Sequence, residues 1–556
     1  MKKVIGIAAS ALVLTPLVGV GWVEASPPAA ALEFIGRYDS GSGEAGSEIV
    51  AYDRSTRTML VTNGATNMID IVSLAQPSTP TLVGQIDLDP YGVGVQSVAA
   101  NAGRAVAVVA GAKDAGVAEP TVLDPGAAVF FDIRTRRVLG TAPTGALPDG
   151  VTWSDDGETV VVANEGEPRC VTVGDRLPTT DPTLAENPEG SVTVIEIDDL
   201  RPRRFDVDVD QVDFRAFNDQ MDVLRTAGVR VGTWPGATVA QDLEPEYPTI
   251  SGDRAYVTLQ ENNAIATIDL DRGRVVAISP LGLKDHSSEA NALDPSDRDG
   301  TPTVFGQLTG PVSGMYMPDA VDAMRFRRST YLFTANEGDG REYFSNLANV
   351  DEIEGVEQDT CFVDEARLRS LSLDPTVFTD PTLRDNAKFG RLKVTSELPS
   401  VAGTGGYTAL ASYGGRSMSI WTAAGQLVWD SGSFFEQMVH SADSASWPTD
   451  GPIPLWATAQ YDTRSDDKGP EPEGLVLGEH RGRTFAFVGL ERAGGVVVFD
   501  VTDPRSPVFQ QWLKVAGDIS PEGLTFVPAN SAPSRKPLVL VAHEISGTTS
   551  VLQLNL

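Results

Sequence analysis

Short apolar runs recur along almost the whole chain, and in many of them apolar and polar residues alternate. Typical runs are TVVVANE (159–165), AYVTLQE (255–261) and YLFTANE (331–337), and turns rich in glycine, aspartate and asparagine separate such runs. A period of two residues predicts strands with one buried face, and the turn Asp155-Asp156-Gly157 predicts a hairpin. Helical periodicity is scarce, so the pattern indicates an all-β protein.

The predicted strands fall into repeated units of three or four. Consecutive small antiparallel sheets of this kind favour a β-propeller, so we predict a single propeller over residues 32–556. Eight candidate second strands can be counted, but the unit at 391–432 lacks a clear first strand. We prefer seven blades, and eight stay open. The last unit ends after its third strand, and we expect residues 32–40 to add its outer strand and close the ring.

Long segments interrupt these units near residues 200–243, 338–390 and 433–470. The first contains a helix-like stretch, the second is irregular and partly helical in pattern, and the third is polar. Segments of this length exceed ordinary hairpin loops and are typical of functional loops or caps. We expect them to lie over one face of the propeller.

One type of hairpin is repeated five times with an acidic residue at both ends. Its fullest form lies at 466–495, where Glu473 follows a proline at the head of one strand and Glu491 ends the next. Because the innermost strands of a propeller line a central channel, a position that recurs in each unit forms a ring. The five copies pair Asp149 with Glu165, Glu246 with Glu261, Asp319 with Glu337, Glu473 with Glu491, and Glu522 with Glu544.

Converging carboxylates repel one another unless a cation lies among them. Calcium is the best match, because it takes about 6–8 oxygen ligands and accepts carboxylate, amide and backbone oxygens together. Another divalent metal or ferric iron stays open, whereas the 4 histidines do not cluster and argue against zinc. We expect neutral oxygens from Asn63, Asn164, Asn262 and Asn336. The predicted metal ligands are Glu165, Glu246, Glu261, Glu337, Glu473, Glu491, Glu522 and Glu544.

Basic residues accompany the acids, and we predict a catalytic set of Arg341, Arg416, Arg492 and Lys468. They would bind the oxygens of a phosphoryl group, while metal ions neutralise charge and activate a water as nucleophile. The alternative is that arginine and glutamate only pair between blades. A further acidic loop at 294–300 is equally compatible with a cation site and with a solvated turn.

The overall charge excludes some partners. The chain of 556 residues has a formal net charge of −33, so nucleic acid and anionic membranes are poor partners. Metal or mineral ions and phosphorylated small molecules fit better. Solubility alone is an equally good explanation of the acidity. We expect a monomer.

The N-terminus predicts export. Two lysines, an apolar run and a small-residue site ending at Ala25 form a signal peptide over residues 1–25. No later segment reaches the ~18 apolar residues that span a bilayer, so we expect a secreted, periplasmic or extracellular protein. In an oxidising compartment Cys170 and Cys361 could form a disulfide, and two free thiols are the alternative.

Several segments give the chain a family likeness: QDLEPEYPTISGDRAYVTLQENNAIATIDL, GMYMPDAV, TANEGDGREY, SYGGRSMSIW, RSDDKGPEPEGL, GLERAGGVVVFDV and HEISGTTSV. They resemble the choice-of-anchor I domain, which also occurs in mesenchyme-specific cell-surface glycoproteins linked to biomineralisation. The likeness runs from about residue 32 to 556. It implies an exported, propeller-like protein with a variable means of surface attachment. Some family members are labelled alkaline phosphatases, and the Pro-Glu-Gly units look like those of calcium-dependent propeller phosphatases and phytases.

Three functions stay open. The first is a metal-dependent, alkaline-phosphatase-like hydrolase of phosphoesters. The second is a non-catalytic calcium-binding propeller for surface interaction or biomineralisation, and the third is an interaction scaffold without metal. The arginines beside the acids favour the first, since a structural calcium site does not need them. The sequence leaves the substrate, the metal and the number of ions open.

Overall fold

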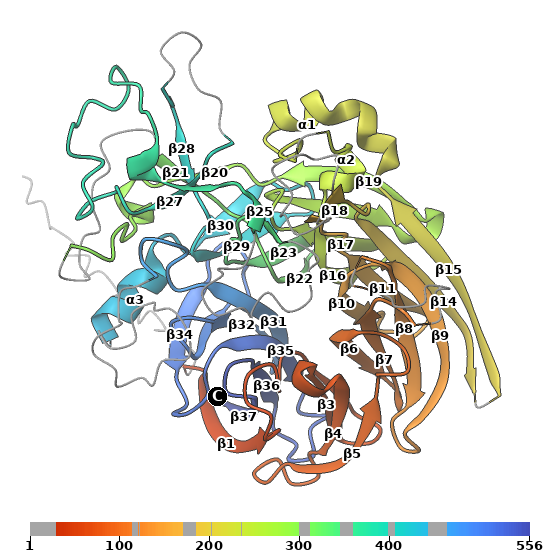
Figure 1. Cartoon of the computed structure of the whole chain (residues 1–556). Helices are drawn as coiled ribbons and strands as arrows, with labels where there is room; N and C mark the ends of the chain where they lie inside the picture. The colour runs from red at the N-terminus through yellow and green to blue at the C-terminus, as the bar shows by residue number, and fades with distance from the viewer. Residues whose placement is uncertain are drawn as a thin grey trace, which may run out of the picture.

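The protein is described here from a computed structural model (Figure 1). The described residues are 29–113, 121, 123–170, 185–201, 203–234, 236–299, 312–344, 360–397, 406–442 and 464–556. They form mostly strands, as the alternating pattern predicts. The signal peptide predicted over residues 1–25 lies outside them.

Within the described residues, seven four-stranded antiparallel sheets form the blades of a propeller. In each blade the strands follow one another outwards from the central strand. The first three blades are β2 (Val50–Asp53), β3 (Thr58–Asn63), β4 (Met68–Ser73) and β5 (Thr81–Asp87); β6 (Gly94–Asn101), β7 (Arg104–Ala110), β8 (Pro125–Asp132) and β9 (Arg137–Ala146); and β10 (Pro148–Trp153), β11 (Thr159–Asn164), β14 (Ser191–Arg201) and β15 (Arg204–Asp213).

The next three blades are β16 (Pro245–Ser251), β17 (Arg254–Leu259), β18 (Ala264–Asp269) and β19 (Arg274–Pro280); β22 (Val321–Phe326), β23 (Ser329–Asn336), β29 (Ser417–Thr422) and β30 (Leu427–Asp430); and β31 (Pro472–His480), β32 (Arg483–Leu490), β33 (Val496–Asp500) and β34 (Val508–Leu513). The seventh is β35 (Pro521–Val527), β36 (Leu538–His543), β37 (Thr548–Asn555) and β1 (Ala31–Asp39).

The central strands form a closed ring. Each contacts the next in the order β2, β6, β10, β16, β22, β31 and β35, and β35 contacts β2. The preference for seven blades over eight is therefore confirmed. The candidate eighth unit is divided between two sheets: β28 (Leu410–Ser412) lies in a separate sheet, whereas β29 pairs with β23 in the blade that begins at β22.

Ring closure joins the two ends of the described chain. β1 pairs antiparallel with β37, from Ala31 opposite Asn555 to Asp39 opposite Thr548. This confirms that residues 32–40 supply the outer strand of the last blade. Leu32 packs in the apolar core of that blade with Val539 and Leu552, so the first strand contributes burial as well as hydrogen bonds.

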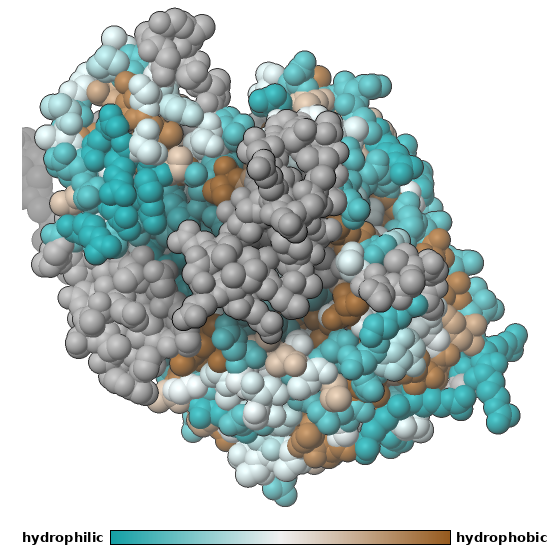
Figure 2. All heavy atoms as spheres, viewed as in Figure 1, coloured by the Kyte–Doolittle hydropathy of each residue, from teal (hydrophilic) through white to brown (hydrophobic). Residues whose placement is uncertain are grey.

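Apolar cores fill the spaces between the blades. One cluster joins Leu60 and Ile71 of one blade to Ala107 and Val129 of the next, and similar clusters recur around the ring. Blades are therefore covered on both faces, which explains why their middle strands have such continuous apolar sequences. On the face seen in Figure 2, hydrophilic side chains gather over the additional sheet described next and at the tip of the β14–β15 hairpin.

Insertions build a second layer, which we call the cap (Figure 1). The segment from 200 still belongs to β14 and β15, so the first insertion begins only after Asp213. The insertion that contains 338–390 separates β23 from β29, two strands of one blade. The cap comprises a five-stranded sheet of β20 (Leu283–Asp285), β21 (Val312–Met315), β28, β27 (Lys393–Thr395) and β26 (Glu365–Arg367), the pairs β12 (Arg169–Cys170) with β13 (Ala185–Glu186) and β24 (Glu342–Phe344) with β25 (Thr360–Val363), and the helices α1 (Met221–Ala227), α2 (Val239–Asp242) and α3 (Phe434–Ala442).

The two cysteines lie on short strands of the cap, Cys170 on β12 and Cys361 on β25. β12, which ends at Cys170, contacts β24, the partner strand of β25, which contains Cys361. The side chains of both cysteines lie outside the described residues, so their pairing stays a prediction. In the part of the chain that the structure describes, no helix has the length and apolar character of a membrane span.

Closure of the ring should depend on the inward face of β1. Leu32 is 4% exposed, and Leu32→Ala should lower the free energy of unfolding by about 2–5 kcal/mol because it leaves a cavity in the blade core. Phe34, 40% exposed on the same strand, is the matched control, and Phe34→Ala should cost less than about 1 kcal/mol. Denaturant unfolding measures both values, and equal losses would contradict this account of closure.

Candidate functional site

An acidic residue occupies the same position of the central strand in six of the seven blades. In the blade of β16, Pro245 pairs with Leu259 and Pro248 with Val257, so Glu246 lies in the bulge between them. The corresponding position lies at or just before the start of each central strand, and acids from different blades raise one another's pKa. Val95 takes this position in the remaining blade. The six acids are Glu48, Asp149, Glu246, Asp319, Glu473 and Glu522.

Glu48 is the member of this ring that the sequence analysis missed. It follows Ser47 rather than a proline, so the Pro-acid motif does not find it. The available signal was its distance from the strand: Glu48 lies two residues before Val50, as Glu246 lies two residues before Pro248, and each of these residues pairs with a valine of the second strand.

A left-handed residue precedes the proline in four blades. Leu147, Met317, Glu471 and Ser520 have φ between 46° and 64°, a conformation that non-glycine residues adopt rarely and that a following proline disfavours. The backbone N–H groups of the second-strand acids help to hold it. Those of Glu165, Glu491 and Glu544 donate to the carbonyls of Leu147, Glu471 and Ser520 at 2.9, 2.7 and 2.9 Å. One turn therefore places both carboxylates of a hairpin.

Burial and mutual repulsion raise the pKa of these acids. The pKa values of Glu246, Glu473 and Glu522 lie well above the ordinary range, mainly because of burial and then because of neighbouring carboxylates. Burial raises the pKa of Asp149 to about 7, and burial with the charge of Glu471 raises that of Glu491 to about 8. Similar shifts hold for Glu48, Glu165, Glu261, Asp319, Glu337 and Glu544.

Several carboxylate oxygens of the ring and of the second-strand acids are buried without a hydrogen-bond donor. They are the Oε2 atoms of Glu246, Glu261, Glu473 and Glu522. A buried acceptor without a partner costs free energy, and a raised pKa is the response of such a group to missing positive charge. The ring is thus suited to a cationic ligand.

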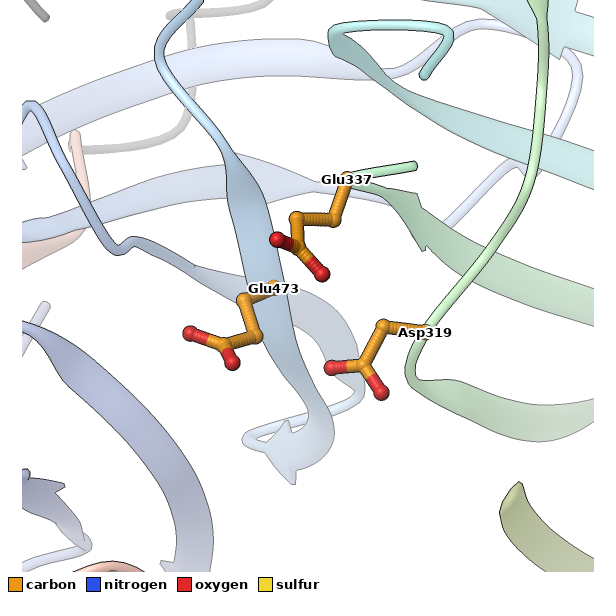
Figure 3. Close-up of side chains that lie close together, drawn as sticks. All are labelled: Asp319, Glu337 and Glu473. Carbon is orange, nitrogen blue, oxygen red and sulfur yellow. The ribbon is translucent and has the colours of Figure 1, made fainter. Parts of the chain in front are cut away.

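Three of the acids form a compact group. Asp319, Glu337 and Glu473 have carboxylate oxygens within 4.8 Å of one another, and Figure 3 shows their side chains side by side, from the segment before β22, the end of β23 and the start of β31. Glu337 also accepts hydrogen bonds from Lys468 Nζ at 2.7 Å and Gln260 Nε2 at 3.0 Å. These donors fix its orientation, as outer partners do for metal-binding carboxylates.

Two of the predicted basic residues lie beside this group. Lys468 Nζ is 2.7 Å from Glu337 and 3.4 Å from Asp339. Arg492 lies 3.2 Å from Glu491 and 3.5 Å from Glu471. Burial opposes the charge of Lys468, but the surrounding carboxylates raise its pKa well above the ordinary value. The structure therefore brings Lys468 and Arg492 to Glu337, Glu473 and Glu491.

Glu471 is a second residue that the sequence analysis missed. Its carboxylate is fully buried and lies 2.7 Å from Arg464, 3.6 Å from Lys468 and 3.5 Å from Arg492. Burial works against its charge, yet Arg464, Lys468 and Arg492 lower its pKa below the ordinary value. Glu471 thus stays ionised and holds three basic side chains at the edge of the acidic ring.

Arg341 and Arg416 occupy different surroundings. The guanidinium of Arg341 is buried in the cap between Asp242 and Glu244, at 3.4 Å from each. That of Arg416 contacts Glu436 at 2.7 Å and donates to the carbonyls of Asp294, Ser465 and Asp467. Both hold cap segments to one another, so we do not include them in the proposed site.

Three of the four predicted amide ligands have hydrogen-bond donors for their oxygens, whereas Asn63 donates to Ser42 and Asp70 and its buried Oδ1 has no donor. The Oδ1 atoms of Asn164, Asn262 and Asn336 accept from the Gly145 N–H, the Glu244 N–H and the Thr334 hydroxyl. In the acidic loop at 294–300, Asp297 pairs with Arg391 at 2.8 Å. The oxygens of Asn164, Asn262 and Asn336 and the carboxylate of Asp297 are therefore held by protein partners.

Known proteins resemble the chain in sequence. The model of the choice-of-anchor I domain matches residues 48–504. Gigasin-3a of Magallana gigas is 25% identical over 189 residues, which cover 31% of this chain and 66% of that protein. The mesenchyme-specific cell surface glycoprotein of Strongylocentrotus purpuratus is 28% identical over 342 residues, or 55% of this chain and 42% of that protein. The chain thus matches less than two thirds of the length of either relative.

Solved structures resemble it more distantly. Kuenenia stuttgartiensis hydrazine synthase superposes with a TM-score of 0.42 and 12% identity, over 92% of this chain and 96% of that chain. The Dos1 propeller gives 0.39 and 10%, over 94% and 95%. The assignment of a propeller rests on the seven blades themselves.

The raised pKa values predict how stability depends on pH. A carboxyl whose pKa is higher in the folded state holds its proton more tightly there. Its contribution to the free energy of unfolding is therefore present at low pH and is lost as pH rises towards the folded pKa. For Asp149 this loss extends from about pH 4 to about 7. In chelator, Asp149→Asn should therefore raise the melting temperature, by more at pH 8 than at pH 5. Asp155→Asn, in an exposed turn of the same blade, is the control; a lower melting temperature for Asp149→Asn at pH 8 would refute the prediction.

Proposed function

We propose that this chain, which belongs to the choice-of-anchor I domain family, is an exported propeller that binds a divalent cation and hydrolyses phosphoesters beside it. The observation that carries the proposal is the compact group of Asp319, Glu337 and Glu473 with Lys468 at its edge. Negative groups that can hold a metal and a positive group that can hold a phosphoryl oxygen adjoin each other there. The substrate would be a phosphorylated small molecule.

The donor set favours calcium. Three carboxylates offer up to six oxygens, and calcium accepts oxygen ligands in flexible geometry, whereas magnesium demands a near-ideal octahedron. The described residues bring no histidine into the group, so the donors match a hard cation better than zinc. Asp319 and Glu473 would take the cation most directly, with Glu337 held in place by Lys468 and Gln260.

The chemistry follows from which residues meet the substrate. A bound cation would neutralise phosphoryl oxygens and lower the pKa of water in its coordination shell. Lys468 and Arg492 supply positive charge at the same edge, where they would orient a phosphoryl group and stabilise its charge in the transition state. Glu471 would position both basic side chains without contacting the substrate.

The relatives support an extracellular setting for this activity. One of them is named as a cell surface glycoprotein, and the N-terminal sequence of this chain has the pattern of a signal peptide. Millimolar calcium outside cells would suit a site of moderate affinity. We propose a secreted, periplasmic or surface location.

Calcium should stabilise the protein through the compact group. At a calcium concentration of about 100 times Kd, the free energy of unfolding should rise by about 2.7 kcal/mol. Glu473→Gln should weaken calcium binding by at least about tenfold in calorimetry, because a ligand charge is lost. Glu479→Gln removes an exposed acid from the same strand and should leave the affinity unchanged. Equal affinities for the two variants would exclude Glu473 as a ligand.

The hydrolase proposal is tested with a chromogenic phosphoester in calcium and in chelator. We expect turnover that requires calcium, and a fall in kcat/KM of at least about tenfold, or ~1.4 kcal/mol, in Arg492→Gln. Arg483→Gln is the matched control, since Arg483 lies at the opposite end of β32 and pairs with Asp500 at 2.7 Å. Calcium binding without turnover on any of several phosphoesters would reject the hydrolase.

That outcome is the second candidate function: a non-catalytic, calcium-binding propeller at the cell surface, for interaction or mineral handling. The roles of Arg341 and Arg416 in the cap favour it, because these two guanidinium groups, predicted to bind phosphate, are enclosed by protein partners instead. In that case chelation would lower the melting temperature, and no phosphoester would be hydrolysed either with or without calcium.

A further inference from the structure

A second acidic region adjoins the compact group, in a cavity of about 280 Å³. Glu165, Glu261 and Asp339 line it, and they lie within three residues after the second strands of three successive blades, β11, β17 and β23. Arg341 and Tyr343 of the cap form another part of the wall. The cavity therefore lies where the propeller meets the cap.

The positively charged residue of the cavity wall, Arg341, already has acidic partners. Arg341 is 1% exposed and its guanidinium is held by Asp242, Glu244 and Thr233. Tyr343 donates its hydroxyl hydrogen to Glu244. These contacts balance Arg341 with acids other than Glu165 and Glu261, so the cavity keeps an excess of negative charge.

The carboxylate of Glu261 has a buried oxygen atom without a hydrogen-bond donor. Glu261 lines the cavity and is 7% exposed, and the oxygen concerned is Oε2. Its backbone carbonyl accepts from Arg230, so the strand end is fixed while the carboxylate is left available. A buried carboxylate oxygen of this kind is stabilised by a charged donor.

The spacing and the volume argue against a bare metal ion here. Among the described residues, two groups of three carboxylates lie within 4.8 Å of one another, and neither includes Glu165 or Glu261. They are Asp319, Glu337 and Glu473, and Glu337, Glu471 and Glu491. The cavity is also much larger than the ~10–15 Å³ that accommodates one water. A ligand with several heavy atoms and more than one donor fits better.

The neighbouring site shows which cation this geometry accepts. There an ammonium group, that of Lys468, lies among Glu337, Asp339 and Glu471 at 2.7, 3.4 and 3.6 Å. An ammonium has three donors and can join carboxylates that are too far apart for one ion. Asp339 belongs to both places, since it contacts Lys468 and lines the cavity.

We propose that this cavity binds the alkylammonium group of an organic amine, with Glu165, Glu261 and Asp339 as its counter-charges. The cavity shares Asp339 with the surroundings of Lys468 but includes none of the three carboxylates proposed to hold the metal ion, and amine binding does not depend on hydrolysis. It assigns Glu165 and Glu261, which the sequence analysis predicts as metal ligands, to an organic cation instead.

The test is calorimetric titration of the full-length mature protein with 1,4-diaminobutane, and with 1,4-butanediol as the uncharged analogue. The diamine should bind and the diol should not. Glu261→Gln and Glu165→Gln should each weaken diamine binding by about tenfold or more. Glu158→Gln, at an exposed position next to β11 in the same blade as Glu165, should change it less than about twofold. Melting temperatures confirm that the variants are folded, and two separate variants guard against the failure of one.

Glu473→Gln separates this site from the proposed cation site, because it should weaken calcium binding and leave diamine binding intact. Loss of diamine binding in Glu473→Gln would overturn the proposal, as would equal diamine affinities in all variants or equal binding of the diol. Competition by calcium that disappears in Glu261→Gln would show a metal ion in the cavity, and this too would overturn it.

Discussion

Repulsion between carboxylates at the propeller axis is the constraint on which the candidate site depends. Closure of the ring brings equivalent positions of the blades together, and six of the seven carry an acid. Two unit charges 4 Å apart repel by about 4 kcal/mol at an effective dielectric constant of 20. Burial raises the pKa values of Glu246 and Glu473, and repulsion from the neighbouring carboxylates raises them further. A positive charge near these carboxylates would therefore stabilise the folded propeller.

The blades differ in the acidic and basic side chains that they contribute. In the blade of β2 the acid at the end of the second strand is replaced by Gly64, where a Cβ atom would come within 2.8 Å of a Glu48 oxygen. The blade of β6 contributes neither acid, since Val95 and Gly111 stand at the two positions. Near β31, the basic side chains of Arg464, Lys468 and Arg492 surround Glu471. The five blades from β10 to β35 thus carry both acids, the blade of β2 carries one, and the blade of β6 carries none.

The sequence predicts the parts of this arrangement that repeat. Alternation and turn chemistry give the strands, and the Pro-acid hairpin gives five of the six ring acids together with their second-strand partners. The motif does not find Glu48, because no proline precedes it. Glu471 cannot be found from the sequence, because its role depends on a left-handed turn and on three basic side chains that meet only in the folded chain. The insertion between β23 and β29 splits one blade by 80 residues, so a count of linear units cannot decide between seven and eight.

The roles of the arginines depend on the cap rather than on the repeat. Arg341 and Arg416 each stand close to a strand end in sequence, as Arg492 does, yet inserted segments supply Asp242, Glu244 and Glu436 to enclose the first two. Breaking such a buried pair leaves an uncompensated charge, so these arginines hold the cap in place. Arg492 has no such cover and remains 26% exposed beside Glu491. Arginines near strand ends therefore acquire different surroundings from the inserted segments that contact them.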